Sequence, residues 1–205
     1  MRSIWNIKVE ELLEQTASAS PTPGGGSVAV VTGGLGLALV AMALEVRLRK
    51  MGQNQALAKL LGQTRARLKN LRQFADQDIE AYQNFVSALS LPKNSDDQKE
   101  ARSQALANAA LNATNVPLRS AREMLSGLEI ASAAAGLVEG AIASDVAAGA
   151  ILLAASLQAV LLNVDVNLSN LKDEVFKEKA LAEKESLLAK AQAIIKTVLH
   201  KTKTA

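Results

Sequence analysis

The segment that most restricts the fold is a run of 17 residues without a charged side chain, Val28–Leu44. It directly follows a loop-forming sequence, Pro-Thr-Pro-Gly-Gly-Gly-Ser, at residues 21–27. Small residues recur here at spacings of three and four: Gly26, Ala29, Gly33 and Gly36. This spacing places them on one helix face, which a second backbone can approach closely. We therefore predict a long, buried helix over residues 27–51, packed against another helix.

The loop before this helix is a candidate binding site. Its prolines restrict the backbone, and its glycines permit the close approach of another group. Such a loop at a helix N-terminus directs several N–H groups at one point, which suits an anion or a polarised oxygen. The candidate residues are Pro23, Gly24, Gly25, Gly26 and Ser27. A purely structural junction is the alternative, and the spacing matches neither a P-loop nor a dinucleotide fingerprint.

Composition favours one helical domain over residues 1–205. Hydrophobic residues make up 49% of the chain but aromatic residues only 2%, so closely spaced helices rich in Ala, Leu and Val should form the core. A net charge of +3 with dispersed basic residues argues against nucleic acid. Because the chain has no cysteine and one histidine, His200, we expect neither disulfides nor a metal site. The acidic N-terminal region argues against a signal peptide, and we expect a cytoplasmic protein.

Two segments raise the alternative of a membrane protein. Val28–Leu44 is at the short limit for a transmembrane helix, and Val146–Val164 contains the amides of Gln158 and Asn163. Neither segment has the flanking Trp or Tyr residues typical of a membrane interface. We therefore expect no membrane partner but buried helices in a soluble homodimer.

Helical periodicity predicts the other elements. We expect a short amphipathic helix over residues 4–16, a long helix over 52–91, and helices over 96–115 and 118–135 with a break or a kink at Pro117 between them. After a loop over residues 136–143, Ser144-Asp145 should open a helix that ends near Leu168, and an amphipathic helix should begin at Lys172. No strand is predicted, so the fold class is all-α, a helical bundle with long buried helices.

Two carboxylates interrupt apolar helix faces. Asp78 lies on a heptad-like seam of the 52–91 helix, one turn before Tyr82. Asp145 begins a small, polar stripe that continues to Asn163 and Asn167. A buried carboxylate is costly unless it is paired or functional. The structural alternatives are an ion pair, a helix cap and interhelical hydrogen bonds, whereas a shared cavity would raise the pKa of at least one carboxylate.

These side chains favour proton transfer over other chemistries. No serine has a histidine partner, and ligands for zinc are lacking. Asp78 and Asp145 are the candidate catalytic groups. Beside the glycine loop, the candidate substrate-binding residues are Lys50, Tyr82, Ser144, Asn163 and Asn167. Such a set suits general acid–base catalysis at a polarised carbonyl or iminium carbon.

Several short blocks, in this order, resemble the C-terminal family of formiminotransferase-cyclodeaminase, which includes single-domain methenyltetrahydrofolate cyclohydrolases. The blocks are Pro21–Val28, Asp78–Tyr82 with Leu91–Lys93, Val116–Leu118, Ser144-Asp145, and Asn163–Leu168 with Asp173. The resemblance covers residues 6–185 and implies an all-helical subunit that dimerises, with a folate site near the subunit contact. The chain departs from the family pattern at residues 138–141 and at residues 46–52, where only Lys50 is similar.

The resemblance implies an enzyme of folate one-carbon metabolism. It would interconvert 5,10-methenyltetrahydrofolate with 10-formyltetrahydrofolate (cyclohydrolase) or with 5-formiminotetrahydrofolate plus ammonia (cyclodeaminase), with no cofactor beyond the tetrahydrofolate substrate. Both reactions pass through a tetrahedral adduct, so one acid–base pair can serve either. The absence of a formiminotransferase half favours the cyclohydrolase. The alternative is a non-catalytic dimer that binds folate or a partner helix.

Overall fold

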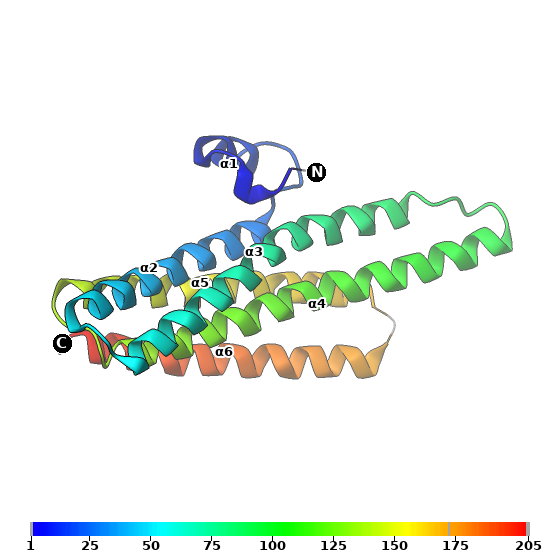
Figure 1. Cartoon of the computed structure of the whole chain (residues 1–205). Coiled ribbons are helices and arrows are strands. Elements are labelled where there is room, and N and C mark those ends of the chain that lie inside the picture. The colour runs from blue at the N-terminus through cyan, green and yellow to red at the C-terminus, as the bar shows by residue number, and fades with distance from the viewer. Residues whose placement is uncertain (1, 172, 204–205) are drawn as a thin grey trace.

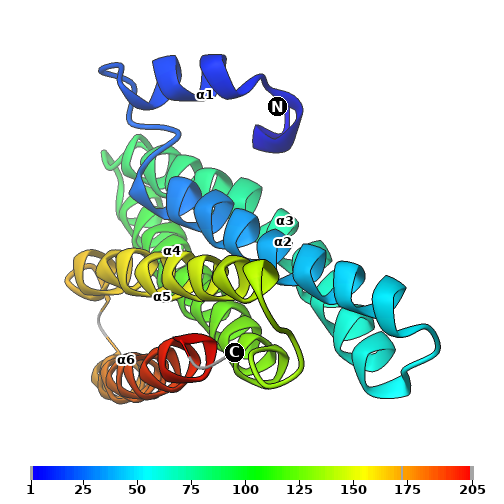
Figure 2. The ribbon, with the colours of Figure 1, turned by 90° about the vertical axis from the view of Figure 1, so that its left-hand side faces the viewer.

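The computed structural model describes residues 2–171 and 173–203, and this part of the chain is all-helical. The elements are the 3₁₀ turn η1 (Ile4–Asn6) and the helices α1 (Val9–Thr16), α2 (Gly25–Met51), α3 (Gln55–Leu89), α4 (Asp96–Ala134), α5 (Ala141–Leu168) and α6 (Glu174–Lys203). The long helices α2 to α6 form a bundle, and α1 lies outside it (Figure 1, Figure 2). The predicted all-α class is confirmed.

The centre of the bundle is the antiparallel pair α2 and α5. A Cβ added to Gly36 would lie 2.7 Å from the carbonyl oxygen of Gly149, so only glycine permits this approach. Towards its N-terminus α2 meets progressively later residues of α5, and at the end of the pair Gly26 lies against Asn163. The small-residue face predicted for α2 therefore packs against another helix backbone, as expected.

Neither central helix is enclosed on all sides. Both are long and apolar enough to span a membrane, and 56% and 50% of their most apolar stretches are buried within the chain. In a single chain α2 is therefore only partly buried, and its burial in a homodimer stays a prediction. Large apolar side chains that are 43–68% exposed lie on the outward sides of the pair: Leu35, Met42, Ile151, Leu162 and Val166. We call these five residues the outer face of α2–α5.

The hairpin of α3 and α4 packs along this central pair and extends beyond it at the tip (Figure 1). The seam predicted on α3 is largely buried from Leu57 to Ala75. Beyond the N-terminus of α2 the seam is no longer covered, so that Tyr82 and Leu89 are 43% and 46% exposed. Asp78 lies at this transition, between the covered and the exposed parts of the seam.

Helix α4 runs without interruption through Pro117, so the predicted division into two helices is wrong. Proline has no N–H, which leaves the carbonyl of Ala113, four residues earlier, without its helical partner. The side-chain amide of Asn167 on α5 donates to this carbonyl at 2.6 Å. A neighbouring helix thus replaces the missing hydrogen bond, which the local sequence does not reveal.

Helix α5 begins at Ala141, three residues before the predicted start. The preceding Gly140 has a φ of 66°, in the left-handed region that glycine tolerates. Ser144 and Asp145 therefore lie inside the first turns, and Ser144 donates its hydroxyl to the carbonyl of Ala141 at 2.7 Å. The prediction that this pair opens the helix as a cap is wrong.

The helix predicted over residues 4–16 is divided into η1 and α1. Asp76 of α3 accepts hydrogen bonds from Ser3 Oγ at 2.6 Å and from the N–H of Ile4 at 2.8 Å. Trp5 Nε1 donates to the carbonyl of Arg72 at 2.8 Å. These contacts hold η1 on the bundle, whereas α1 contains no buried residue.

Candidate functional site

A cavity of about 210 Å³ lies at the N-terminus of α2, where the loop before this helix meets α3, α4 and α5. The predicted site residues in its lining are Gly24, Gly25, Gly26, Asp78, Tyr82, Asn163 and Asn167. Sequence reasoning missed Phe85 and Val166, which add apolar wall. Phe85 follows Tyr82 on the seam of α3, and that spacing was the available signal.

Asp78 supplies the carboxylate of this cavity. Burial raises its pKa above the ordinary value of 3.8, and this effect outweighs hydrogen bonds from the Ser27 N–H and the Asn163 amide, which lower the pKa. Asn163 Nδ2 lies 3.4 Å from Asp78 Oδ1. None of the other described lining residues is acidic or basic, so the carboxylate has no counter-charge there. A carboxyl group in such surroundings suits a general acid or base.

The glycines of the loop have different surroundings. None has a positive φ among the described residues, where only Gly52 and Gly140 do, so backbone freedom does not explain them. A Cβ on Gly26 would overlap the carboxylate and the amide that meet above it. A Cβ on Gly25 would meet nothing within 4 Å. Gly26 therefore provides room for two side chains, whereas Gly25 borders open space.

Two predicted residues of the loop lie beside the cavity rather than in its lining. Pro23 is buried and borders an adjacent hollow beneath the N-terminal segment. Ser27 is fully buried, and its hydroxyl donates to the carbonyl of Gly24 at 3.1 Å. Both residues support the start of α2.

Lys50, Ser144 and Asp145 lie towards the opposite end of the α2–α5 pair. Asp145 precedes Asn163 by 18 residues on one helix, which separates them by about 27 Å along the axis. Asp78 and Asp145 thus do not share a cavity within one chain. The condition that both stripes face one cavity is therefore not met within one chain, because the two ends of a long helix cannot reach one point.

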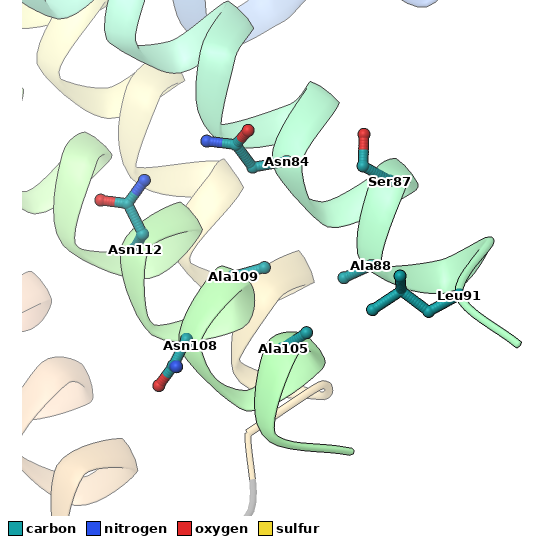
Figure 3. A pocket seen from close by; sticks show the side chains of 8 residues that line it. All are labelled: Asn84, Ser87, Ala88, Leu91, Ala105, Asn108, Ala109 and Asn112. Carbon is teal, nitrogen blue, oxygen red and sulfur yellow. The ribbon is translucent and has the colours of Figure 1, made fainter. Parts of the chain in front are cut away.

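A second cavity, of about 410 Å³, lies between α3 and α4 near the tip of their hairpin (Figure 3). Its polar groups come from Asn84, Ser87, Asn108 and Asn112, around alanines and Leu91. None of these lining side chains is ionisable, so this cavity lacks an acid–base group. Residues 2–171 and 173–203 also contain no cluster of three His, Cys, Asp or Glu side chains that could hold a metal ion.

Fold and site together define a class: an all-helical protein with a pocket that holds a buried carboxylate between a glycine loop and the helices behind it. The family model of formiminotransferase-cyclodeaminase matches residues 8–186, so the chain belongs to this family. The resemblance inferred from the short sequence blocks is thereby confirmed.

Individual relatives agree with this assignment. A methenyltetrahydrofolate cyclohydrolase from Methylorubrum extorquens is 33% identical over 202 residues, 97% of each chain. A formimidoyltransferase-cyclodeaminase from Rattus norvegicus is 27% identical over 95% of this chain, which spans only 37% of that protein. The crystal structure of formiminotetrahydrofolate cyclodeaminase from Thermotoga maritima superposes with a TM-score of 0.86, at 25% identity over 98% of both chains.

Proposed function

We propose that this protein is an enzyme of folate one-carbon metabolism that hydrolyses 5,10-methenyltetrahydrofolate to 10-formyltetrahydrofolate. The observation that carries the proposal is one carboxylate, Asp78, with a raised pKa in a cavity whose other described lining residues are neither acidic nor basic. The cyclohydrolase relative aligns over nearly its whole length, which favours this reaction. The full-length similarity to the Thermotoga maritima cyclodeaminase supports the alternative, formation of the methenyl compound from 5-formiminotetrahydrofolate with release of ammonia.

The charge of the substrate suits this cavity. The methenyl carbon belongs to a cationic amidinium group, which a carboxylate without a competing cation attracts. Water adds to this carbon while Asp78 accepts one of its protons. The adduct then loses its hydroxyl proton to solvent as the bond to N5 breaks, and N5 takes the proton from Asp78, so that one proton is released overall. In the alternative reaction N10 adds to the formimino carbon and its proton passes to the formimino nitrogen. The carboxyl group of Asp78 then donates a second proton to this nitrogen as its bond to carbon breaks and ammonia leaves, and Asp78 regains a proton from solvent.

The size of the cavity indicates which part of a folate it takes. Its volume is below the roughly 300–1,000 Å³ of typical small-molecule sites. We therefore place the ring system with the one-carbon unit inside and the rest of the folate at the mouth, beside the exposed side chains of Tyr82 and Val166. This proton transfer requires no cofactor beyond the tetrahydrofolate substrate.

The proposal includes a cytoplasmic homodimer formed through the outer face of α2–α5. Large exposed apolar side chains in one region mark an interaction surface. In a two-fold contact centred on α5, the first turns of α5 in one chain would lie beside the last turns in the other. Such a contact would carry the partner's Asp145 towards the cavity. Light scattering in detergent-free buffer tests this, because a lipid-bound protein would not stay soluble and a monomer would contradict the dimer.

The activity is tested by following the near-ultraviolet absorbance of 5,10-methenyltetrahydrofolate with wild-type protein, Asp78→Asn and buffer alone. We expect wild-type protein to accelerate the loss of absorbance and Asp78→Asn to approach the buffer rate. Ammonia release from 5-formiminotetrahydrofolate tests the alternative reaction. If neither substrate reacts while folates still raise the melting temperature, the protein is a non-catalytic folate binder. Absence of both effects would refute a folate site.

A further inference from the structure

We propose that Asn163 is a positioning residue for Asp78, and that residue 26 is a glycine so that these two side chains can meet. This inference rests on the proposed function, since it assigns how the acid–base group of that reaction is held.

The contacts of the carboxylate come from two helices. Asn163 on α5 directs Nδ2 at Asp78 Oδ1 over 3.4 Å, and the N–H of Ser27 in the first turn of α2 also donates to this carboxylate. Asp78 itself belongs to α3. Donors from two directions restrict rotation of the carboxylate and favour its ionised form. Burial acts in the opposite direction, so the two hydrogen bonds keep a desolvated carboxyl group able to ionise.

Gly26 is part of this arrangement. The carboxylate and the amide both occupy the space that a Cβ of residue 26 would need. Any side chain there would push the pair apart or away from the N-terminus of α2. The last glycine of the loop therefore serves the protein's own acid–base group rather than direct contact with a ligand.

The neighbouring asparagine provides an internal comparison. Asn167 lies one turn further along α5 and lines the same cavity, but its amide donates to the carbonyl of Ala113 on α4. The two asparagines share side-chain chemistry and helix, and they differ in what their amides hold. Of the two asparagines, only Asn163 contacts the carboxylate of Asp78. Only the loss of Asn163 should therefore affect the ionisation of Asp78.

The test compares Asn163→Leu with Asn167→Leu, because leucine branches at Cγ as asparagine does and has no donor. The pKa of Asp78 is measured in the free protein by carbon-13 NMR of its carboxyl group, and kcat and KM are measured against pH. We expect Asn163→Leu to raise the pKa of Asp78, because a donor that favours the charged form is lost. The acidic limb of kcat, where protonation of Asp78 removes the base, should move to higher pH, and kcat should fall about 10- to 100-fold, the scale of one hydrogen bond to a charged group. Asn167→Leu should lower the melting temperature and leave the pKa of Asp78 unchanged.

An unchanged pKa and kcat in Asn163→Leu, with only a lower melting temperature, would overturn the inference and assign Asn163 a structural role. If Asn163→Leu does not fold, Asn163→Asp decides, since it keeps the shape but places a second carboxyl group beside Asp78. It should raise the pKa of Asp78 and slow turnover, and unchanged values would again overturn the inference. Gly26→Ala should produce the same pKa shift as Asn163→Leu, and no shift would refute the role of Gly26. If wild-type protein shows no turnover, the proposed function is refuted. The NMR titration would still decide whether Asn163 affects the pKa of Asp78.

Discussion

The two ends of the α2–α5 pair differ in whether a charged side chain has a partner of opposite charge. At the cavity end, Asp78 is desolvated, without a counter-charge in the cavity, and held by hydrogen bonds. At the far end, Arg47 pairs with Glu139 at 2.9 Å, with 68% of the Glu139 side chain exposed. Only 19% of the Arg47 side chain is exposed, so this cation is largely buried but has a counter-charge that water reaches and screens. The comparison teaches that burial without a counter-charge, rather than residue type, selects the candidate acid–base group.

The largest effect should come from the carboxylates at the two ends. Asp78→Asn should lower turnover by about 10²-fold or more, the scale of a general acid or base. Asp145→Asn should do the same if the partner's Asp145 completes the cavity. Mixed dimers of the two variants should then recover activity, because one of their two sites retains both carboxylates. If mixing does not restore activity, the partner's Asp145 does not contribute to the site, and the reaction depends on residues at the Asp78 end alone.

The next effect concerns access to the cavity end. Gly25→Val adds bulk next to open space without a clash in the protein, so helicity should persist while folate affinity falls by about tenfold or more, which corresponds to ~1.4 kcal/mol. Gly62→Val is the matched control, since Gly62 on α3 also has nothing near its added Cβ and lies outside the cavity. Isothermal titration with a folate panel measures both variants. If Gly25→Val binds folates with normal affinity, the loop is a structural junction and not part of the binding site.

A smaller effect concerns Asn167, the asparagine of the cavity end whose amide stabilises α4. Asn167→Ala should lower the free energy of unfolding by about 1–3 kcal/mol, because the carbonyl of Ala113 loses its donor. In a Pro117→Ala background residue 117 again has an N–H for that carbonyl, so the same change should cost less. Urea denaturation of the four proteins in this double-mutant cycle gives the coupling. Strictly additive changes would show that Asn167 does not compensate for Pro117.

The smallest effect is on stability and depends on pH. Because the pKa of Asp78 is raised on folding, its contribution to stability is fully present below the ordinary value of 3.8 and is lost as the pH rises through the raised pKa. At neutral pH the folded protein must therefore hold a desolvated charge, and Asp78→Asn should raise the melting temperature. This gain should shrink as the pH falls towards 3.8. Calorimetry across this pH range measures the trend, and a lower melting temperature at neutral pH would contradict it.

The sequence predicted the all-helical class, the packing of α2 and the carboxylate at one end of the candidate site. The small-residue spacing predicted that α2 packs on a backbone, and the seam of α3 singled out Asp78 because a carboxylate interrupts an apolar row. Sequence spacing could not predict distances between helices. It placed Asp78 on the seam of one helix and Asp145 on the polar stripe of another, but it did not reveal that Asp78 meets this stripe at Asn163 rather than at Asp145. It also misplaced a helix boundary at Pro117, since the compensating donor comes from a residue 50 positions later.

The hydrogen bond between Asn167 and Ala113 has a consequence for how the chain reaches this structure. Until α5 docks, the carbonyl opposite Pro117 has only water to bond, and the middle of α4 is the weakest part of that helix. Helices α4 and α5 should therefore gain order together, as one cooperative folding unit, and loosen together when the protein opens. The cavity rests on both helices, so the floor of the candidate site is assembled in the same event that completes α4.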